Sequence, residues 1–135
     1  MSLFNVFNIS SSALSAQSQR LNTVASNLAN AETITGADGT PYKSKQVSFK
    51  SASIDGSNFH GVAVDKVIED QTPPRMSYQP GNPLANKEGY VTMPNVNVTQ
   101  EMVNMISTTR SYQNSVETMN AAKAMLQKTL SIGQS

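Results

Sequence analysis

The sequence has 135 residues, and its 10 Lys and Arg against 9 Asp and Glu give a formal net charge of +1. A chain of this length can build one compact core with extensions but not two large cores, and its balanced charge creates no field that would draw nucleic acid or an anionic membrane. Cysteine is absent, which excludes disulfides, thiolate nucleophiles and cysteine metal sites, and leaves the chain suited to a reducing or an oxidising compartment.

The first ten residues, MSLFNVFNIS, do not have the pattern of a secretory signal peptide. They lack a basic start, and Asn5 and Asn8 interrupt their apolar run. No segment approaches the roughly 20 apolar residues of a membrane span. We therefore expect no cleaved signal and no direct membrane insertion, so any export would use a route that does not read a conventional signal peptide.

Residues 1–33 are predicted to form a long N-terminal helix. Apolar or small residues recur at alternating steps of four and three, as in a heptad seam: Leu3, Phe7, Ser10, Leu14, Gln17, Leu21, Val24, Leu28 and Ala31. Thr35-Gly36 follows as an end signal. The other face carries Ser, Asn, Gln and Thr, and Arg20 is the only charged residue before Glu32. Such side chains can be buried without the desolvation cost of an ion, so we expect other helices, mainly from other subunits, to surround this helix.

Residues 34–95 are predicted to form a loop and a small β-rich domain, because most of the glycines and all six prolines lie there. Four segments are expected to be extended: Val47–Phe49, Val62–Ile68, Arg75–Gln79 and Tyr90–Met93. The second would place Val62, Val64 and Ile68 on one face. Asp55-Gly56 suits a hairpin connection with a longer loop.

Residues 96–135 are predicted to form a second long helix. Asn97 and Gln100 resemble a capping box, and Gly133 stands where a C-terminal stop is expected. A second seam steps by three and four: Met102, Met105, Thr109, Tyr112, Val116, Met119, Lys123, Leu126 and Leu130. Some 34 helical residues would be about 50 Å long, more than a small compact domain needs. The predicted fold is α+β: two long terminal helices packed as a coiled-coil-like pair, with a small β-rich middle domain.

No group of residues points to catalysis. His60 is the only histidine, in an expected loop, so neither a histidine zinc site nor a Ser-His arrangement is indicated. Glu69 and Asp70 are adjacent, whereas a glycosidase holds two carboxylates apart across a cleft. The local lysines around Tyr42 favour protection of a strand edge over nucleic-acid binding. The methionines of the last helix, Met102, Met105, Met119 and Met125, favour adaptable packing over a ligand role. We predict no enzyme activity, cofactor, metal or small-molecule substrate.

Both ends of the chain resemble a known family. SALSAQSQRLNTVASNLANAET, from Ser12 to Thr33, resembles the amino-terminal signature of flagellar basal-body rod and other axial proteins, in which a small-residue helix ends in a run like Asn27–Ala31. GYVTMPNVNVTQEMVNMISTTRSYQNSVETMNAAKAMLQKTLSIG, from Gly89 to Gly133, closely resembles the carboxy-terminal signature of the proximal rod branch. Ile34–Lys43 replaces the Thr-x-Gly-Tyr turn of many axial proteins, again as in that branch, and the short length excludes the longer hook and distal rod types.

The resemblance implies structural work. Proteins of this family are exported by the flagellar type III apparatus and polymerise into the hollow periplasmic rod that transmits torque from motor to hook. Their helices form the inner layer of the tube, and the β-containing middle faces outward. The implied partners are copies of the chain, other flagellar rod proteins, and inner-membrane ring and export-gate components at the rod base.

By similarity, ten residues are assigned to subunit packing: Leu14, Leu21, Leu28, Asn30, Met102, Ile106, Tyr112, Val116, Met119 and Leu126. For each of them, a place in the intrachain core is an equally open interpretation. The alternative function is a non-polymeric helical adaptor that binds one partner through its C-terminal seam.

Overall fold

The computed structural model describes residues 3–36, 39–54 and 58–133 of the chain. The elements are, in order, α1 (Leu3–Ala29), β1 (Lys45–Ser53), β2 (His60–Glu69), β3 (Arg75–Tyr78), β4 (Tyr90–Met93) and α2 (Val98–Gly133). The fold is α+β, and all four segments predicted to be extended contain strands. The expected Asp55-Gly56 connection lies outside the described residues.

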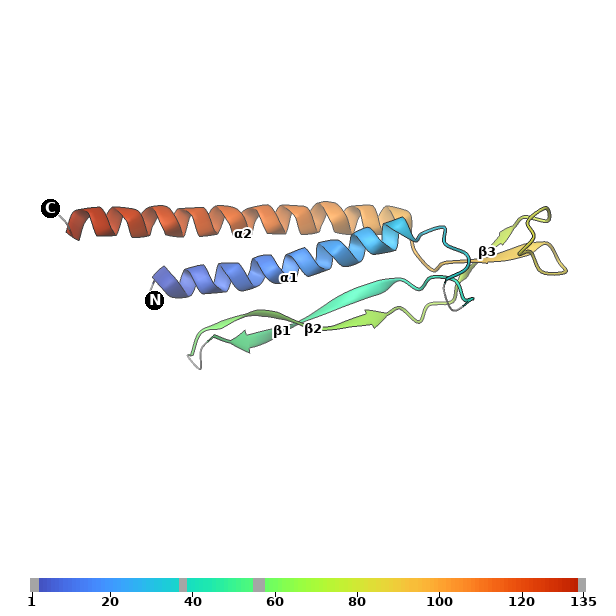
Figure 1. Cartoon of the computed structure of the whole chain (residues 1–135), viewed down its shortest axis with the longest axis horizontal. Coiled ribbons are helices and arrows are strands. Elements are labelled where there is room, and N and C mark those ends of the chain that lie inside the picture. The colour runs from blue at the N-terminus through green and yellow to red at the C-terminus, as the bar shows by residue number, and fades with distance from the viewer. Residues whose placement is uncertain (1–2, 37–38, 55–57, 134–135) are drawn as a thin grey trace.

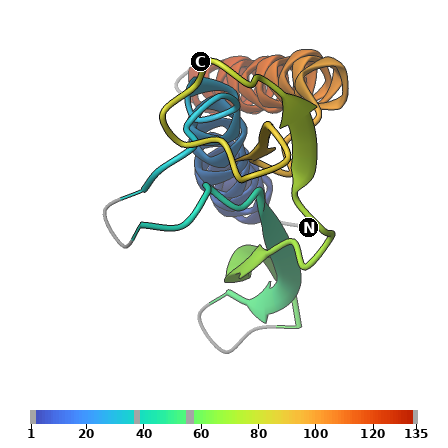
Figure 2. The ribbon, with the colours of Figure 1, turned by 90° about the vertical axis from the view of Figure 1, so that its right-hand side faces the viewer.

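The two helices lie side by side and run in opposite directions, and the β1–β2 hairpin covers the side of α1 that faces away from α2 (Figure 1). Figure 2, a view along the helices, shows the same three layers, with α1 in the middle. The middle layer is therefore covered on two sides, while its remaining surface, which includes Phe4 and Phe7, is exposed.

The helices differ in length, with 27 residues in α1 and 36 in α2. At 1.5 Å per residue they are about 40 and 54 Å long. The last turns of α2 consequently project beyond the first residues of α1 (Figure 1). The Asn97 half of the predicted capping box is present, because the Asn97 Oδ1 accepts a hydrogen bond of 3.1 Å from the Gln100 backbone N–H, whereas the Gln100 side chain donates to the Asn104 Oδ1 (3.5 Å).

The β1–β2 hairpin is antiparallel, and its register runs from Lys45 opposite Glu69 to Ser53 opposite His60. The register shifts between Ser48 and Phe49, which face Lys66 and Val64, so Asp65 is an extra residue on β2. A bulge of one residue reverses the alternation of faces along the strand. The prediction that Ile68 shares a face with Val62 and Val64 is therefore wrong.

The hairpin contacts α1 closely at Gly61. A Cβ placed there would lie 2.5 Å from the Ser12 Oγ, so only glycine fits without a shift. The Ser12 hydroxyl accepts a hydrogen bond from the Val62 N–H (3.1 Å) and donates one to the Ile9 carbonyl (2.7 Å). One serine thus fastens the start of β2 to the first half of α1.

Strands β3 and β4 form a separate two-stranded antiparallel sheet, from Arg75 opposite Met93 to Tyr78 opposite Tyr90. This sheet, which we call the β3–β4 arm together with the connecting residues 79–89, extends beyond the end of the helices (Figure 1). The predicted single β-rich middle is thus two separate ribbons.

The buried core consists of small residues. Its apolar members are Ala16, Val24, Ala31, Val91, Val96 and Ala122. Among the side chains that the structure describes, no Leu, Ile, Met or Phe falls in the buried class. The larger apolar residues, each worth about 1.5–3 kcal/mol on full burial, are left partly or largely in contact with water.

The seam predicted along α1 is only partly buried. Ser10, Val24 and Ala31 are buried, whereas Leu14, Gln17, Leu21 and Leu28 are half-buried and Phe7 is exposed. The most buried residues of α1 include Ala16, Thr23 and Asn27, which lie outside the predicted seam. They are buried because α1 packs against the hairpin as well as against α2, an arrangement that a two-helix heptad pattern does not anticipate.

Candidate functional site

Asn27, near the end of α1, is fully buried, with an exposed fraction of 0%. Its Nδ2 donates to the Lys45 carbonyl (2.8 Å) and to the Glu101 Oε2 (3.0 Å). Its Oδ1 accepts from the Lys45 N–H (2.9 Å) and from the Tyr42 hydroxyl (3.0 Å). An asparagine amide has two donor hydrogens and two acceptor lone pairs, so its capacity is completely used. This one side chain ties the end of α1 to the start of β1 and to the first turn of α2.

Asn95, in the segment that enters α2, makes a second three-way connection. Its Oδ1 accepts from the Ser44 N–H (2.7 Å), and its Nδ2 donates to the carbonyls of Asp70 and Thr72, both at 3.0 Å. Ser44 precedes β1, and Asp70 and Thr72 follow β2. Asn27, Asn95 and Glu101, which we call the polar junction, therefore fix the place where both helices and the hairpin meet.

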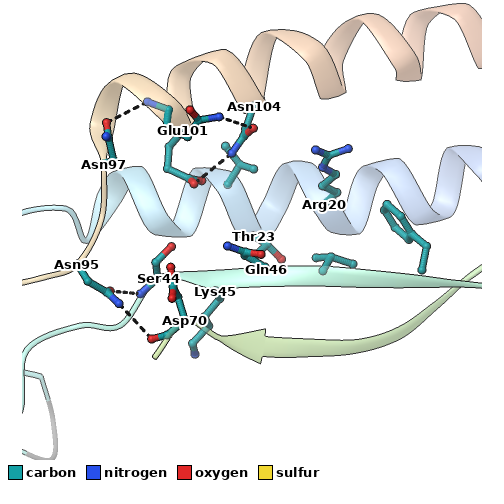
Figure 3. A pocket seen from close by; sticks show the side chains of 14 residues that line it. Arg20, Thr23, Ser44, Lys45, Gln46, Asp70, Asn95, Asn97, Glu101 and Asn104 are labelled. Atoms are coloured by element: carbon teal, nitrogen blue, oxygen red, sulfur yellow. Dashed lines mark hydrogen bonds between the residues drawn. The ribbon is translucent and has the colours of Figure 1, made fainter. Parts of the chain in front are cut away.

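A polar cleft of about 500 Å³ opens beside the polar junction (Figure 3). Arg20 of α1, Gln46 of β1 and Asn104 of α2 are among the residues that line it. The Asn104 Nδ2 donates to the Glu101 Oε1 (3.2 Å), so both oxygens of this buried carboxylate accept hydrogen bonds from amides. The only ion pair recorded among the described residues is Lys50–Asp65, at 3.4 Å on the surface. Glu101 is therefore held in place by hydrogen bonds from neutral amide groups.

Asp70, on the wall of the cleft, is held by Thr72. The hydroxyl and the backbone N–H of Thr72 both donate to the Asp70 Oδ1, at 2.6 and 2.9 Å. The hydroxyl bond first, and then the backbone bond, lower the pKa of the Asp70 carboxyl below its ordinary value of 3.8. The ionised Asp70 carboxylate thus accepts the two hydrogen bonds that close the turn from Asp70 to Thr72.

The residues weighed for catalysis lie apart from the cleft or from one another. His60 is not in a loop as predicted but is the first residue of β2, where it is exposed and pairs with Ser53. Within the described part of the chain, no three His, Cys, Asp or Glu residues gather as metal ligands would. Of the methionines considered, Met102 and Met125 are exposed, and Met105 and Met119 are half-buried.

The ten residues assigned to subunit packing divide into two groups by burial. Met102, Ile106 and Tyr112 are exposed. The other seven are half-buried: Leu14, Leu21, Leu28, Asn30, Val116, Met119 and Leu126. Asn30 makes local bonds, since its Nδ2 donates to the Ser26 carbonyl (2.8 Å) and its Oδ1 accepts from Thr33 (3.2 Å). It closes the end of α1.

The sequence analysis singled out Asn30 and missed Asn27 three residues before it. Both belong to the run Asn27–Ala31 on which the family resemblance rests. Only the spatial proximity of Lys45 and Glu101, the latter 74 residues further along the chain, distinguishes the fully buried asparagine from the capping one. The family signature was therefore the one signal that could have pointed to Asn27.

Two apolar surfaces of α2 are uncovered. The first, the outer stripe, lies in the first three turns and consists of Val98, Met102, Val103 and Ile106. The second, which we call the terminal patch, is the group of exposed apolar residues in and next to the turns that project beyond α1, and its members, spread around the helix, are Met125, Leu130 and Ile132. Among the described residues, neither helix is long and apolar enough to cross a membrane. Exposed apolar residues that gather in this way are typical of sites of contact with other proteins.

Comparisons with known proteins agree with the resemblance at both ends. The family described as "Flagella basal body rod protein" matches residues 7–37, and the family described as "Flagellar basal body rod FlgEFG protein C-terminal" matches residues 87–132. The first match contains α1 from Phe7 onward and the run Asn27–Ala31, and the second contains α2 up to Ile132.

Full-length relatives carry one name, "Flagellar basal-body rod protein FlgC". The chain is 58% identical over 134 residues to the protein of Yersinia enterocolitica and 54% identical over 134 residues to that of Salmonella typhimurium (strain LT2). It is 41% identical over 150 residues to that of Bacillus subtilis (strain 168), and each comparison covers 99% of this chain and 100% of the relative. The predicted absence of enzymatic activity is confirmed, since the family is structural. The chain therefore belongs to the FlgC family of flagellar basal-body rod proteins and is a structural subunit of that rod.

Proposed function

We propose that the chain works by polymerising, with copies of itself and with other flagellar rod proteins, into the hollow periplasmic driveshaft that transmits torque from motor to hook. The observation that carries the proposal is the apolar surface that α2 leaves uncovered in a single copy, the outer stripe and the terminal patch. Covering apolar area contributes about 25 cal/mol per Å². Neighbouring subunits would supply the cover that one chain lacks.

The ten packing residues keep their proposed role in contacts between subunits. Met102, Ile106 and Tyr112 are exposed and can be covered only from outside the chain. Leu14, Leu21 and Leu28 are half-buried, so each can contact its own chain and a neighbour at once. A coiled-coil-like seam between α1 and α2 of one chain is part of the proposal, with residues 1–33 and 96–135 as the axial units and 34–95 as the outer one.

The proposal also covers how the chain is exported and what it contacts at the base of the rod. We infer from family membership that the flagellar type III apparatus exports the chain and that ring and export-gate components contact it at the rod base. The small-residue core favours this role, because a chain without large buried side chains has little core to unfold before passage through a narrow channel.

Replacement of Ile106 by Asp tests the polymerisation. Ile106 is exposed, so the variant chain should fold and be exported normally, while a charge would be trapped at the subunit contact without a partner. We expect loss of swimming, and absent rods in electron micrographs of purified basal bodies. Gln113→Asp, which adds the same charge at an exposed polar position of the same helix, is the matched control and should swim. Normal swimming of the Ile106→Asp strain would contradict the proposal.

The alternative function, a freestanding adaptor with one partner, is not favoured, because the chain matches rod proteins over its whole length. A discrete complex of fixed size in solution would be its signature.

A further inference from the structure

The β3–β4 arm carries an exposed apolar surface that no other part of the chain uses. Its members, which we call the tip patch, are Met76, Tyr78, Leu84 and Tyr90, with exposed fractions between 40% and 64%. The rings of Tyr78 and Tyr90 pack edge to face, with centroids 5.3 Å apart. Aromatic residues and methionine are enriched where proteins contact one another.

The tip patch is held in shape by its own loop. The Asn86 Oδ1 accepts from the N–H groups of Glu88 (3.0 Å) and Tyr90 (2.9 Å), and the Asn82 Oδ1 accepts from the Leu84 N–H (3.0 Å). Gly89 has a φ of +83°, and a Cβ there would lie 2.8 Å from the Tyr78 ring. A preformed surface loses little conformational freedom on binding, so its apolar area translates efficiently into affinity.

The arm is anchored through Val91, which is fully buried, and through the Arg75 Nε, which donates to the Pro94 carbonyl (3.3 Å). Among the described elements, β3 and β4 contact each other and neither helix nor the β1–β2 hairpin, and the arm extends beyond the end of the helices (Figure 1). A two-stranded hairpin alone is marginally stable in water. The exposed tip patch is therefore left available for contact with a surface outside its own chain.

We propose that the tip patch of one copy docks on the outer stripe of a neighbouring copy, an inference that rests on the polymerisation proposed above. Both surfaces consist of apolar side chains, and no charged side chain is exposed between Val98 and Thr109, where the single acid, Glu101, is buried. No ion would have to be desolvated on the stripe when an apolar surface covers it.

The size and the geometry of the two surfaces fit a polymer better than a dimer. With about 200 Å² for a fully exposed side chain of this size, the two surfaces together offer on the order of 800 Å². A stable pair in solution needs about 1,200–2,000 Å², so the contact would hold only where it is repeated and joined by others. Two different surfaces in contact make a head-to-tail interface, which generates rings or helical filaments rather than closed pairs.

Chemical cross-linking tests the contact directly, because the chain has no cysteine of its own. We would introduce Leu84→Cys and Met102→Cys together and treat purified basal bodies with a bifunctional maleimide. The expected result is covalent dimers and longer ladders of this chain. Each single variant should give none, and neither should Leu84→Cys with Gln113→Cys, which moves the second thiol to an exposed position further along α2.

Intact rods from the double variant without ladders would overturn the inference and leave the proposed function standing. A cross-link from Leu84→Cys to a cysteine of another protein, seen as a product of different mass, would also overturn it and identify another rod component as the partner. Failure of the proposed function is distinct, since rods would then form normally in cells that lack this chain.

If the cysteine variants do not assemble, a pair of charged substitutions, one on each surface, tests the same contact. Leu84→Glu and Ile106→Lys should each abolish swimming, because each places one charge in an apolar contact. The two together should restore swimming by forming a pair across the interface. A double variant that stays immotile, or single variants that swim normally, would refute the docking.

Discussion

Replacement of Asn27 by Ala should destabilise the chain far more than replacement of any other asparagine in the first helix. The change removes four hydrogen bonds at once, two of them to the N–H and the carbonyl of the half-buried Lys45. The Tyr42 hydroxyl and the Glu101 carboxylate also lose a partner, but Tyr42 is half-buried and lies 3.3 Å from the Ser26 hydroxyl, and Glu101 borders the cleft. These two groups can recover a bond to water or to a neighbour.

The magnitude follows from the four hydrogen bonds. A hydrogen bond contributes about 0.5–1.5 kcal/mol net, so the loss of four amounts to about 2–6 kcal/mol. Small domains are stable by about 5–15 kcal/mol in total. The variant should therefore lose a large share of its stability, and β1 should detach from α1 where the two elements meet.

Asn30→Ala is the matched control, since it removes an asparagine one turn away that bonds to Ser26 and Thr33 near the surface. We expect it to cost about 0.5–1.5 kcal/mol, the usual net worth of a hydrogen bond. Urea unfolding followed by circular dichroism gives both free energies, and hydrogen exchange of the Lys45 amide reports the junction itself. Equal losses in the two variants, or a Lys45 amide as protected in Asn27→Ala as in the native chain, would refute the reasoning.

Three further predictions follow from other contacts. The Leu21→Asp variant should be exported yet fail to assemble, because the substitution puts a charge on a half-buried position of α1. Recovery of the variant outside the cytoplasm measures its export, and swimming measures its assembly. Normal swimming would contradict the prediction. Gly61→Ala should lower the unfolding free energy by about 1–3 kcal/mol, since the added methyl group overlaps the Ser12 hydroxyl; an unchanged urea midpoint would argue against that contact. Thr72→Val should raise the pKa of Asp70 toward 3.8 in an NMR titration. Because the native pKa is lowered, this bond stabilises the fold above pH 3.8 and is lost as the pH falls through the native pKa, and an unshifted titration in the variant would contradict this role.

The helices and strands could be predicted because they depend on local pattern. Long runs free of Gly and Pro gave both helices, and the β-branched residues of Val62–Ile68 marked β2. The bulge at Asp65 was missed, since the sequence of β2 alternates acceptably with or without an extra residue and only the pairing with Ser48 and Phe49 reveals the shift.

The polar junction could not be predicted from pattern. Asn27, Lys45 and Glu101 lie far apart in the sequence, and no periodicity connects an asparagine at a helix end to an acid in the first turn of another helix. The burial of small residues such as Ala16 and Thr23, instead of the leucines of the predicted seam, has a similar cause. A third layer, the hairpin, packs on α1 and changes which face is most covered.

An in-frame deletion in the source bacterium, scored by swimming and by electron microscopy of purified basal bodies, tests the central claim most directly. The account predicts loss of motility with rings present and rod and hook absent, and recovery of both when the chain is supplied in trans. Complete rods and normal swimming in the deletion strain would contradict the proposed role of this chain as a polymerising subunit of the rod.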